Sequence, residues 1–156
     1  MALQVGEKAP DFKLYNSEKQ EVSLSDFKGK NVVVLFFPLA FTGVCTAELC
    51  EMRDNIATYS QLNAEILGIS VDSLFTLEKF KAEQKLPFNL LSDFNKDVSS
   101  SYGSLYENFV LGMKGVSKRS AFVVDAEGTI QYAEVLEDAG KTPSFEAVQS
   151  ALASLS

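Results

Sequence analysis

The stretch that decides the fold is residues 31–50, which read NVVVLFFPLAFTGVCTAELC. It opens with an unbroken β-branched and aromatic run as far as Phe37, which is typical of a central strand covered on both faces. Pro38 ends that run because proline cannot donate a hydrogen bond to a sheet ladder. From Gly43 onwards the pattern predicts a helix that reaches about Leu62. The apolar residues that recur there at helical spacing are Leu49, Met52, Ile56 and Tyr59.

Strands and helices alternate along the rest of the chain. A short hairpin over 12–15 and 21–24 is predicted before the decisive stretch. Further strands are predicted at 65–71, 89–91, 121–125 and 129–135, and further helices at 74–85, 96–102 and 144–155. Alternation followed by a late hairpin indicates an α/β fold, with a central mixed β-sheet and helices on both of its faces.

Two segments carry more specific expectations. The helix over 74–85 should direct Leu77 and Phe80 into the core, with Phe75 as a third candidate. The segment 102–118 follows neither a helical nor a strand pattern. Because functional residues are often found on loops, this segment is a candidate wall of the site.

Length and composition indicate one domain, residues 1–156, with 46% apolar residues to build its core. No stretch approaches the roughly 20 consecutive apolar residues that a membrane helix needs. Residues 1–8 lack the basic start and apolar middle of a signal peptide, so we expect a cytoplasmic protein. In that compartment two cysteines are more often catalytic or redox-active than a structural disulfide.

The charged residues and the missing histidines exclude several classes of function. The net charge of −7 should repel nucleic acid and anionic membranes. The chain has no histidine, which excludes Cys-His and Ser-His dyads. Two cysteines alone are too few ligands for a zinc site, so no metal is expected. A reactive thiol in this chain must therefore be activated by another kind of group.

Cys45 lies in the first turn of the predicted helix, on the same face as the apolar stripe. That turn has unpaired backbone N–H groups and the positive end of the helix dipole, both of which favour a thiolate over a thiol. Cysteine is also a common small core residue. From its position alone Cys45 is therefore either a nucleophile or a buried apolar side chain.

Cys50 points about 140° away from the centre of the apolar stripe, as expected for about 100° per residue. Five residues along a helix separate two Cα atoms by about 8.6 Å. A disulfide requires about 4.4–6.8 Å. Cys45 and Cys50 therefore either never pair, or pair only when the first turns of the helix unfold.

Three further residues have ordinary structural interpretations beside functional ones. Thr42 is well placed to be a helix N-cap, and Pro38 to be a strand terminator. Arg119 stands before the strand at 121–125, where a solvated surface charge is the usual outcome. The order of Pro38, Thr42 and Cys45 becomes a specific signal because a strand leads directly into a helix there.

That order, Pro-x-x-x-Thr-x-x-Cys, resembles the signature of the peroxiredoxins, and Arg119 matches the distant arginine of that family. The likeness extends over nearly the whole chain, through segments 6–12, 24–30, 69–72, 91–93 and 119–125. It implies a thioredoxin-like fold with an added N-terminal β-hairpin. It also implies a thiol-dependent peroxidase that reduces hydrogen peroxide and organic hydroperoxides.

The chain combines features of two groups within that family. Cys45, Glu48 and Cys50 are arranged as in the peroxiredoxin Q (bacterioferritin comigratory protein) group. Residues 38–43 look more like the alkyl hydroperoxide reductase E group, whose better-known members have no cysteine at the second position. The Gly-Gly-Leu-Gly and Tyr-Phe segments of the typical two-cysteine, hyperoxidation-sensitive group are not found in this sequence.

The resemblance implies a catalytic role for each residue of the signature. The Cys45 thiolate attacks the peroxide, and Thr42 binds both the thiolate and the peroxide. Arg119 stabilises the charge that develops along the O–O bond. Pro38 shields the site from water. The backbone N–H groups of Val44 and Cys45 contact the peroxide oxygens.

Glu48 is implied to position the arginine, although a solvated helix charge is its ordinary interpretation. Cys50 is implied to resolve the oxidised Cys45 as an intramolecular disulfide. A thioredoxin- or glutaredoxin-like dithiol then reduces the disulfide, and no cofactor is required. We expect a homodimer, or else a monomer.

Residues Phe41, Phe109, Val110 and Leu111 are candidates for an apolar rim of the site or a dimer contact. Two other functions stay open on the residues alone. The chain could be a non-catalytic thioredoxin-fold sensor or adaptor that passes oxidation to a partner. A thiol–disulfide oxidoreductase is less favoured, because such motifs place two residues between the cysteines and not four.

Overall fold

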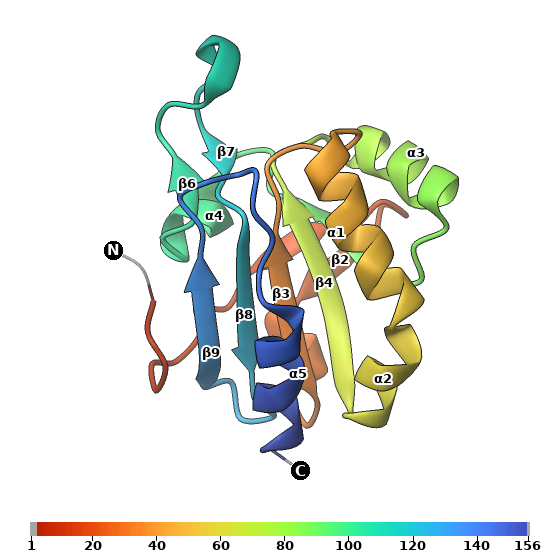
Figure 1. Ribbon diagram of the computed structural model, residues 1–156, viewed down its shortest axis with the longest axis vertical. Helices are drawn as coiled ribbons and strands as arrows, with labels where there is room; N and C mark the ends of the chain where they lie inside the picture. Colours follow the sequence, from red (N-terminus) through yellow and green to blue (C-terminus); the bar gives the residue numbers. More distant parts are fainter. Residues whose placement is uncertain (1–2, 156) are drawn as a thin grey trace.

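The computed structural model describes residues 3–155 and is built around a five-stranded sheet (Figure 1). The strands lie in the order β5-β4-β3-β8-β9. Their bounds are Asn89–Ser92, Ala64–Ser70, Asn31–Phe36, Ser120–Val124 and Ile130–Val135 in that order. β3, β4 and β5 run parallel, whereas β8 is antiparallel to β3 and β9. The predicted mixed sheet is confirmed. Of the expected domain, residues 1–2 and 156 lie outside the described part.

The predicted N-terminal hairpin is also present. β1 (Lys13–Tyr15) and β2 (Glu21–Ser23) pair antiparallel and lead into the short 3₁₀ helix η1 (Leu24–Phe27). A second small ladder joins β6 (Leu105–Tyr106) to β7 (Val116–Ser117) within the segment that the sequence left irregular. The 3₁₀ turn η2 (Val110–Gly112) lies between those two strands.

Helices and the hairpin cover the two faces of the sheet (Figure 1). The helices are α1 (Gly43–Asp54), α2 (Ile56–Gln61), α3 (Leu74–Gln84), α4 (Asp97–Ser101) and α5 (Phe145–Ala153). α1, α2, α3 and α5 supply apolar side chains to one face, where Val33 and Leu35 of β3 lie. The hairpin, η1 and α4 cover the other face, where Val32 and Val34 lie. β3 is therefore buried on both faces, as its continuous apolar run predicts.

The prediction of a single helix from Gly43 to Leu62 is wrong in one respect, because the helix is broken at Asn55. That residue has φ −110° and ψ 17°, and it separates α1 from α2. Its side-chain amide donates to the Glu51 carbonyl at 2.9 Å. Asparagine competes with the helix for such backbone groups, which accounts for the break. The apolar stripe nevertheless continues across it, since Leu49, Met52 and Tyr59 are all buried.

The prediction that Phe75 is a third core residue of α3 is also wrong. Leu77 and Phe80 are fully buried, but Phe75 is 61% exposed. Two residues along a helix turn the side chain by about 200°, so Phe75 points away from the face of Leu77. Its ring instead lies under the Lys19 ammonium, 5.8 Å from the ring centre.

Within residues 3–155, no helix has both the length and the apolar character needed to cross a membrane.

Candidate active site

The turn between β3 and α1 is fixed by Asp72, which follows β4. The Asp72 carboxylate accepts hydrogen bonds from the Ala40 backbone N–H at 2.8 Å and from the Ser70 hydroxyl at 2.7 Å. Phe41 adopts φ 67°, a left-handed conformation that reverses the chain direction just before the helix. Its ring packs against Phe80 of α3, with the ring centres 5.1 Å apart. The start of α1 is therefore held against the turn that follows β4 and against α3.

Cys45 occupies the first turn of α1 and is completely buried. The first bond of the helix runs from the Thr46 N–H to the Thr42 carbonyl, at 2.9 Å. The N–H groups of Val44 and Cys45 come before that bond, so they belong to the donors that an α-helix leaves unpaired at its N-terminus. They belong to the same first turn as Cys45.

One guanidinium joins the two acidic groups of the site. Arg119 Nη2 lies 3.2 Å from Cys45 Sγ, and Arg119 Nη1 lies 2.7 Å from Glu48 Oε1. Cys45 and Glu48 are three residues apart on α1, so both reach the same neighbour. Arg119 is 2% exposed and Glu48 is 1% exposed. The ordinary interpretations of both as solvated charges are therefore wrong.

The Ala139 carbonyl holds the other side of the guanidinium. It accepts from Arg119 Nε at 3.1 Å and from Arg119 Nη2 at 2.9 Å. With Glu48 and Cys45, this carbonyl gives the guanidinium acceptors on three sides. Sequence reasoning missed Ala139, because a backbone acceptor on an irregular loop leaves no signal in residue type.

Burial dominates the protonation of Glu48. Complete burial raises the pKa of Glu48 from its ordinary 4.5 to about 7, although the Arg119 guanidinium acts in the opposite direction. Only Glu48 Oε1 is bonded to Arg119, and Glu48 Oε2 has no hydrogen-bond partner among the described residues. Burial alone would lower the pKa of Arg119, but the negative charges of Glu48 and Cys45 raise it overall. The arginine therefore stays charged at any physiological pH.

Thr42 stands at the N-cap position of α1, yet its side chain does not cap the helix. Its hydroxyl donates to the Leu39 carbonyl at 2.8 Å. That bond leaves the lone pairs of the hydroxyl free to accept. Pro38 is buried beside this turn. The sequence-based N-cap interpretation of Thr42 is thus right for its backbone and wrong for its side chain.

A pocket of about 360 Å³ opens onto the Cys45 sulfur. It is formed by the β3–α1 turn, by the segment around η2, and by Arg119 with the loop that follows β9. Its lining residues are Pro38, Leu39, Thr42, Gly43, Val44, Cys45, Phe109, Val110, Leu111, Met113, Arg119, Ala139 and Gly140. Five of the predicted site residues (Pro38, Thr42, Val44, Cys45 and Arg119) meet there, and the segment 102–118 contributes a wall as expected. Leu39, Met113 and Gly140 were not singled out by the sequence.

Cys50 lies outside that pocket. Its side chain is half-buried, and its Sγ donates to Gln84 Oε1 of α3 at 3.4 Å. Both cysteines are free thiols, and both lie within the continuous helix α1. This agrees with the spacing argument that an intact helix keeps the two sulfurs apart.

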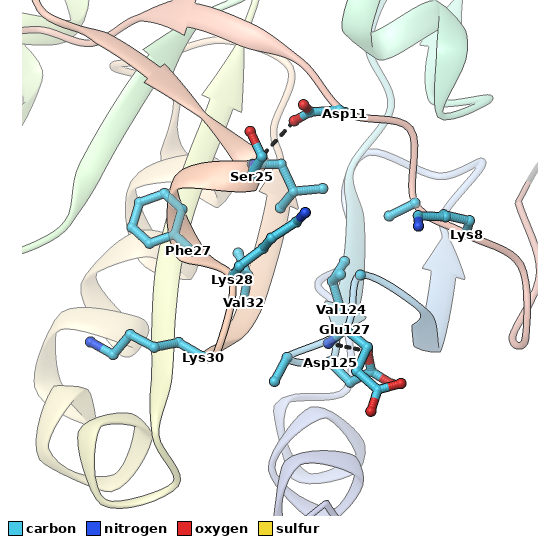
Figure 2. A pocket seen from close by; sticks show the side chains of 14 residues that line it. Lys8, Asp11, Ser25, Phe27, Lys28, Lys30, Val32, Val124, Asp125 and Glu127 are labelled. Carbon is cyan, nitrogen blue, oxygen red and sulfur yellow. Dashed lines mark hydrogen bonds between the residues drawn. The ribbon is translucent and has the colours of Figure 1, made fainter.

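A second pocket lies at the far end of β8, beyond Val124 (Figure 2). Three lysines and three carboxylates line it, so its charges cancel: Lys8, Lys28, Lys30, Asp11, Asp125 and Glu127. Asp11 and Asp125 already accept backbone N–H groups, from Ser25 at 3.1 Å and from Glu127 at 2.9 Å. Neither cysteine lines this pocket, which excludes it as the place of thiol chemistry.

The sequence and the structure are similar to those of several known proteins. The model of the AhpC/TSA family matches residues 5–133. Peroxiredoxin Bcp of Bacillus subtilis (strain 168) is 38% identical over 132 residues, which cover 83% of each chain. The chloroplastic 2-Cys peroxiredoxin BAS1 of Spinacia oleracea is 39% identical over 142 residues, 84% of this chain and 52% of that one.

Solved structures give the same result. Peroxidoxin BcpB from Mycobacterium tuberculosis superposes with a TM-score of 0.83 at 28% identity, covering 98% of this chain and 96% of that one. The AhpC of Enterococcus faecalis superposes with a TM-score of 0.87 at 28% identity, covering 99% of this chain and 92% of that one. The likeness therefore spans the whole fold and not only the motif.

Proposed function

Because the chain belongs to the AhpC/TSA family and is a peroxiredoxin, a thiol-dependent peroxidase, we propose that Cys45 is the sulfur that attacks the peroxide. The predicted thioredoxin-like fold is confirmed by the same comparisons. The observation that carries the assignment of Cys45 is its contact with Arg119, at 3.2 Å in a fully buried position. A guanidinium so close to a buried sulfur favours the thiolate, which is the reactive form.

In the proposed first step the Cys45 thiolate attacks the outer oxygen of hydrogen peroxide or an organic hydroperoxide. The S–O bond forms as the O–O bond breaks, and the peroxide proton moves to the departing oxygen. Sulfur is oxidised to the sulfenic acid level, and the peroxide is reduced to water or an alcohol. Arg119 and the N–H groups of Val44 and Cys45 stabilise the charge that moves along the O–O axis.

The surrounding residues then have supporting roles. The Thr42 hydroxyl, whose proton is directed to Leu39, is free to accept the peroxide O–H. Pro38 and the apolar wall of Val110 and Met113 exclude water from the sulfur. Glu48 keeps the guanidinium in place through its 2.7 Å contact. The proposed chemistry requires no metal or organic cofactor.

In the second step Cys50 attacks the oxidised Cys45. An S–S bond forms as the S–O bond and the Cys50 S–H bond break, and the oxygen leaves as water with the Cys50 proton and one proton from solvent. The first turns of α1 must unwind for this step, since both cysteines lie in one intact helix. A thioredoxin- or glutaredoxin-like dithiol then reduces the disulfide by exchange.

Assembly and location belong to the same proposal. Val110 and Leu111, which line the pocket, are 60% and 94% exposed, and Phe41 beside Thr42 is 49% exposed, an arrangement suited to a homodimer contact. A monomer at high concentration in light scattering would contradict the dimer. We further propose that the enzyme works in the cytoplasm, where dithiol reductants are available.

The two cysteines are tested by separate substitutions. We expect Cys45→Ser to abolish peroxide consumption, because no other thiol lines the pocket. Cys50→Ser should react once per chain and then stall when cycling is coupled to thioredoxin. Steady-state assays with thioredoxin and glutaredoxin, together with a single-turnover assay, measure both effects. Peroxide turnover by Cys45→Ser would contradict the assignment of Cys45, and full cycling by Cys50→Ser would contradict only the resolving role of Cys50.

A further inference from the structure

The position of the Arg119 guanidinium depends on an irregular loop. The Ala139 carbonyl, which accepts from two of its nitrogens, lies between the end of β9 and the start of α5. No helix or strand fixes this carbonyl. The place of Arg119 beside Cys45 therefore depends on whatever anchors the loop.

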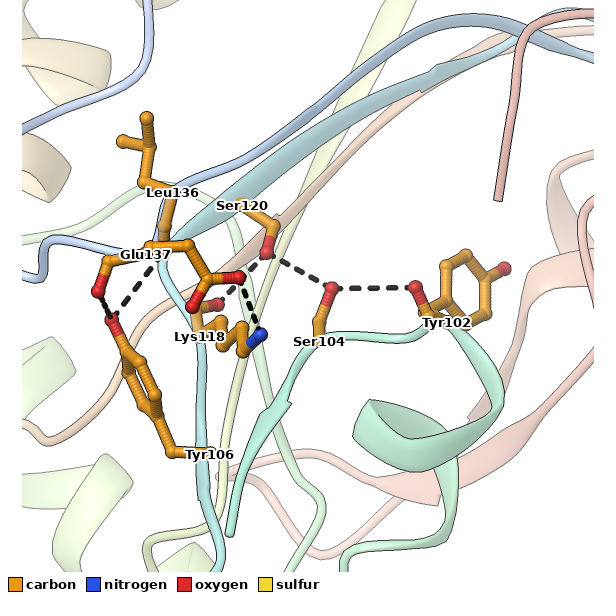
Figure 3. Close-up of polar contacts among 7 residues, drawn as sticks. All are labelled: Tyr102, Ser104, Tyr106, Lys118, Ser120, Leu136 and Glu137. Carbon is orange, nitrogen blue, oxygen red and sulfur yellow. Dashed lines mark hydrogen bonds and ion pairs between the residues drawn. The ribbon is translucent and has the colours of Figure 1, made fainter. Parts of the chain in front are cut away.

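The hydroxyl of Tyr106 anchors the start of that loop (Figure 3). It lies 2.8 Å from the Glu137 carbonyl oxygen and 3.3 Å from the Leu136 carbonyl oxygen. The Leu136 N–H in turn donates to the Arg119 carbonyl at 2.9 Å. The loop is thus tied at its first residues both to β6 and to the residue that it positions.

Tyr106 is itself rigidly held. It is 9% exposed, and its ring stacks on Phe109, with the ring centres 5.1 Å apart and the planes inclined by 29°. Burial, followed by the nearby Glu137 charge, raises the pKa of Tyr106, so the phenol remains a neutral donor. Phe109 lines the pocket over Cys45, whereas Tyr106 lines only the neighbouring hollow beside Glu137.

A buried serine contact fixes the backbone of Arg119 relative to β6. The Ser120 hydroxyl oxygen lies 2.9 Å from both the Ser104 hydroxyl and the Lys118 carbonyl oxygen, which share its one proton (Figure 3). The Lys118 N–H donates to the Ser104 carbonyl at 2.6 Å. Both neighbours of Arg119 are therefore bonded to the residue that leads into β6, so β6 is a fixed reference for the Arg119 backbone.

We infer that Tyr106 is a positioning residue for the peroxidase reaction: its hydroxyl fixes the loop whose Ala139 carbonyl holds the Arg119 guanidinium between Cys45 and Glu48. The inference rests on the proposed function of Arg119 and Cys45. Without the hydroxyl, the first two loop carbonyls lose their shared donor. The start of the loop then depends on the Leu136 N–H bond and on the Lys118–Glu137 ion pair, so the Ala139 carbonyl is less firmly held and the guanidinium shifts with it. Tyr106 itself touches neither sulfur nor peroxide.

The test is Tyr106→Phe, which removes one oxygen and keeps the stacked ring. We expect the rate constant for sulfenic acid formation at Cys45 to fall about tenfold, because small errors in position are costly at a reacting centre. The rate of Cys45 alkylation, measured in the Cys50→Ser background, should fall as well, since a displaced guanidinium favours the thiolate less. A merely structural role would lower stability and leave both rates per folded molecule unchanged.

Tyr102→Phe is the matched control. Tyr102 is also a buried phenol, and it donates to the Pro10 carbonyl at 2.7 Å, but it packs on the face of the sheet opposite to Cys45. Both variants lose one buried hydrogen bond, so urea unfolding should reveal similar losses of stability. Rates are normalised to the folded fraction given by circular dichroism. Only Tyr106→Phe should slow the reaction with peroxide.

The outcomes separate the inference from the function on which it rests. If Tyr106→Phe reacts as fast as the parent protein while Cys45→Ser is inactive, the positioning role is wrong and the proposed function stands. The same conclusion follows if Tyr102→Phe slows the reaction to the same degree. If Cys45→Ser still turns over peroxide, the proposed function itself fails.

Discussion

The two cysteines lie on the same helix and have opposite surroundings. Cys45 is fully buried and lies 3.2 Å from a guanidinium that comes from 74 residues further along the chain. Cys50 is half-buried and donates to the neutral amide oxygen of Gln84 at 3.4 Å, while the nearby Arg53 guanidinium is bonded to the Gln84 carbonyl and to Asp54. Both belong to α1, so secondary structure alone does not distinguish them. The difference comes from what the rest of the fold brings to each sulfur.

This contrast assigns the two thiols to different tasks. A buried sulfur beside a fixed positive charge is suited to rapid attack on a small peroxide that enters a pocket. A half-buried sulfur with a weak, neutral partner is easily released when the helix start unwinds. The first sulfur thus requires a rigid environment, and the second requires a mobile one.

Substitution of Arg119 should produce the largest change in the difference between the reactivities of Cys45 and Cys50. Arg119→Leu removes the charge beside Cys45 and leaves Glu48 buried without a partner, so we expect peroxide reactivity to fall about 100-fold. Arg119→Lys should be nearly as slow, because an ammonium cannot bridge Cys45, Glu48 and Ala139 together. Stopped-flow single turnover in the Cys50→Ser background measures the effect. Near-normal rates in Arg119→Leu would mean that the guanidinium does not set the reactivity of Cys45 apart from that of Cys50, and would contradict the contrast between the two thiols.

Glu48 should produce a smaller effect, visible in the pH dependence of stability. Its pKa is raised to about 7 in the folded state from an ordinary 4.5, so the folded protein binds the extra proton between those values. Stability should therefore decrease as pH rises from 4.5 to about 7, and this contribution is about 3 kcal/mol. Glu48→Gln has no such proton to lose and keeps an acceptor for Arg119.

Urea unfolding of both proteins near pH 4.5 and above pH 7 provides the comparison. The stability of Glu48→Gln relative to the parent protein should increase as pH rises, because only the parent has to ionise a buried carboxyl group. A difference that stays constant with pH would contradict the raised pKa of Glu48.

The smallest effect should appear at Cys50. Gln84→Ala removes the amide that accepts from Cys50, whereas the Arg53 guanidinium still bonds to the Gln84 backbone carbonyl at 2.7 Å. A single neutral hydrogen bond is weak, so disulfide formation after oxidation should accelerate only about threefold. Glu83→Ala, on an exposed neighbour, is the control. Slower disulfide formation in Gln84→Ala would mean that Gln84 assists resolution and does not restrain it.

Much of this arrangement could be predicted from the sequence, and the limits have physical reasons. The run before Pro38 and the spacing of Leu49, Met52 and Tyr59 determine a strand, a helix and its buried face. The inward position of Cys45 follows from the same spacing. These features are local, because they depend on residues that are close in the chain.

The unpredicted features depend on contacts between distant segments. The Ala139 carbonyl is a backbone group, and the Tyr106 hydroxyl bonds to backbone carbonyls. Residue type does not indicate which backbone groups will be used in this way. Asn55 breaks the helix by bonding to its own backbone, a competition that the apolar stripe does not show. Arg119 was found through the family resemblance alone, since its position before a strand did not predict burial.

The proposed function depends on the Arg119 guanidinium, which lies 3.2 Å from Cys45 Sγ, where a positive charge favours the reactive thiolate. The most direct test is the ultraviolet absorbance of the thiolate at about pH 7 in Cys50→Ser, which has a single sulfhydryl, compared with the Cys50→Ser/Arg119→Leu double variant. We expect a clear thiolate signal in the first protein that largely disappears in the second. Equal absorbance in the two proteins would show that the guanidinium does not ionise the sulfur, and would contradict the proposed role of Arg119.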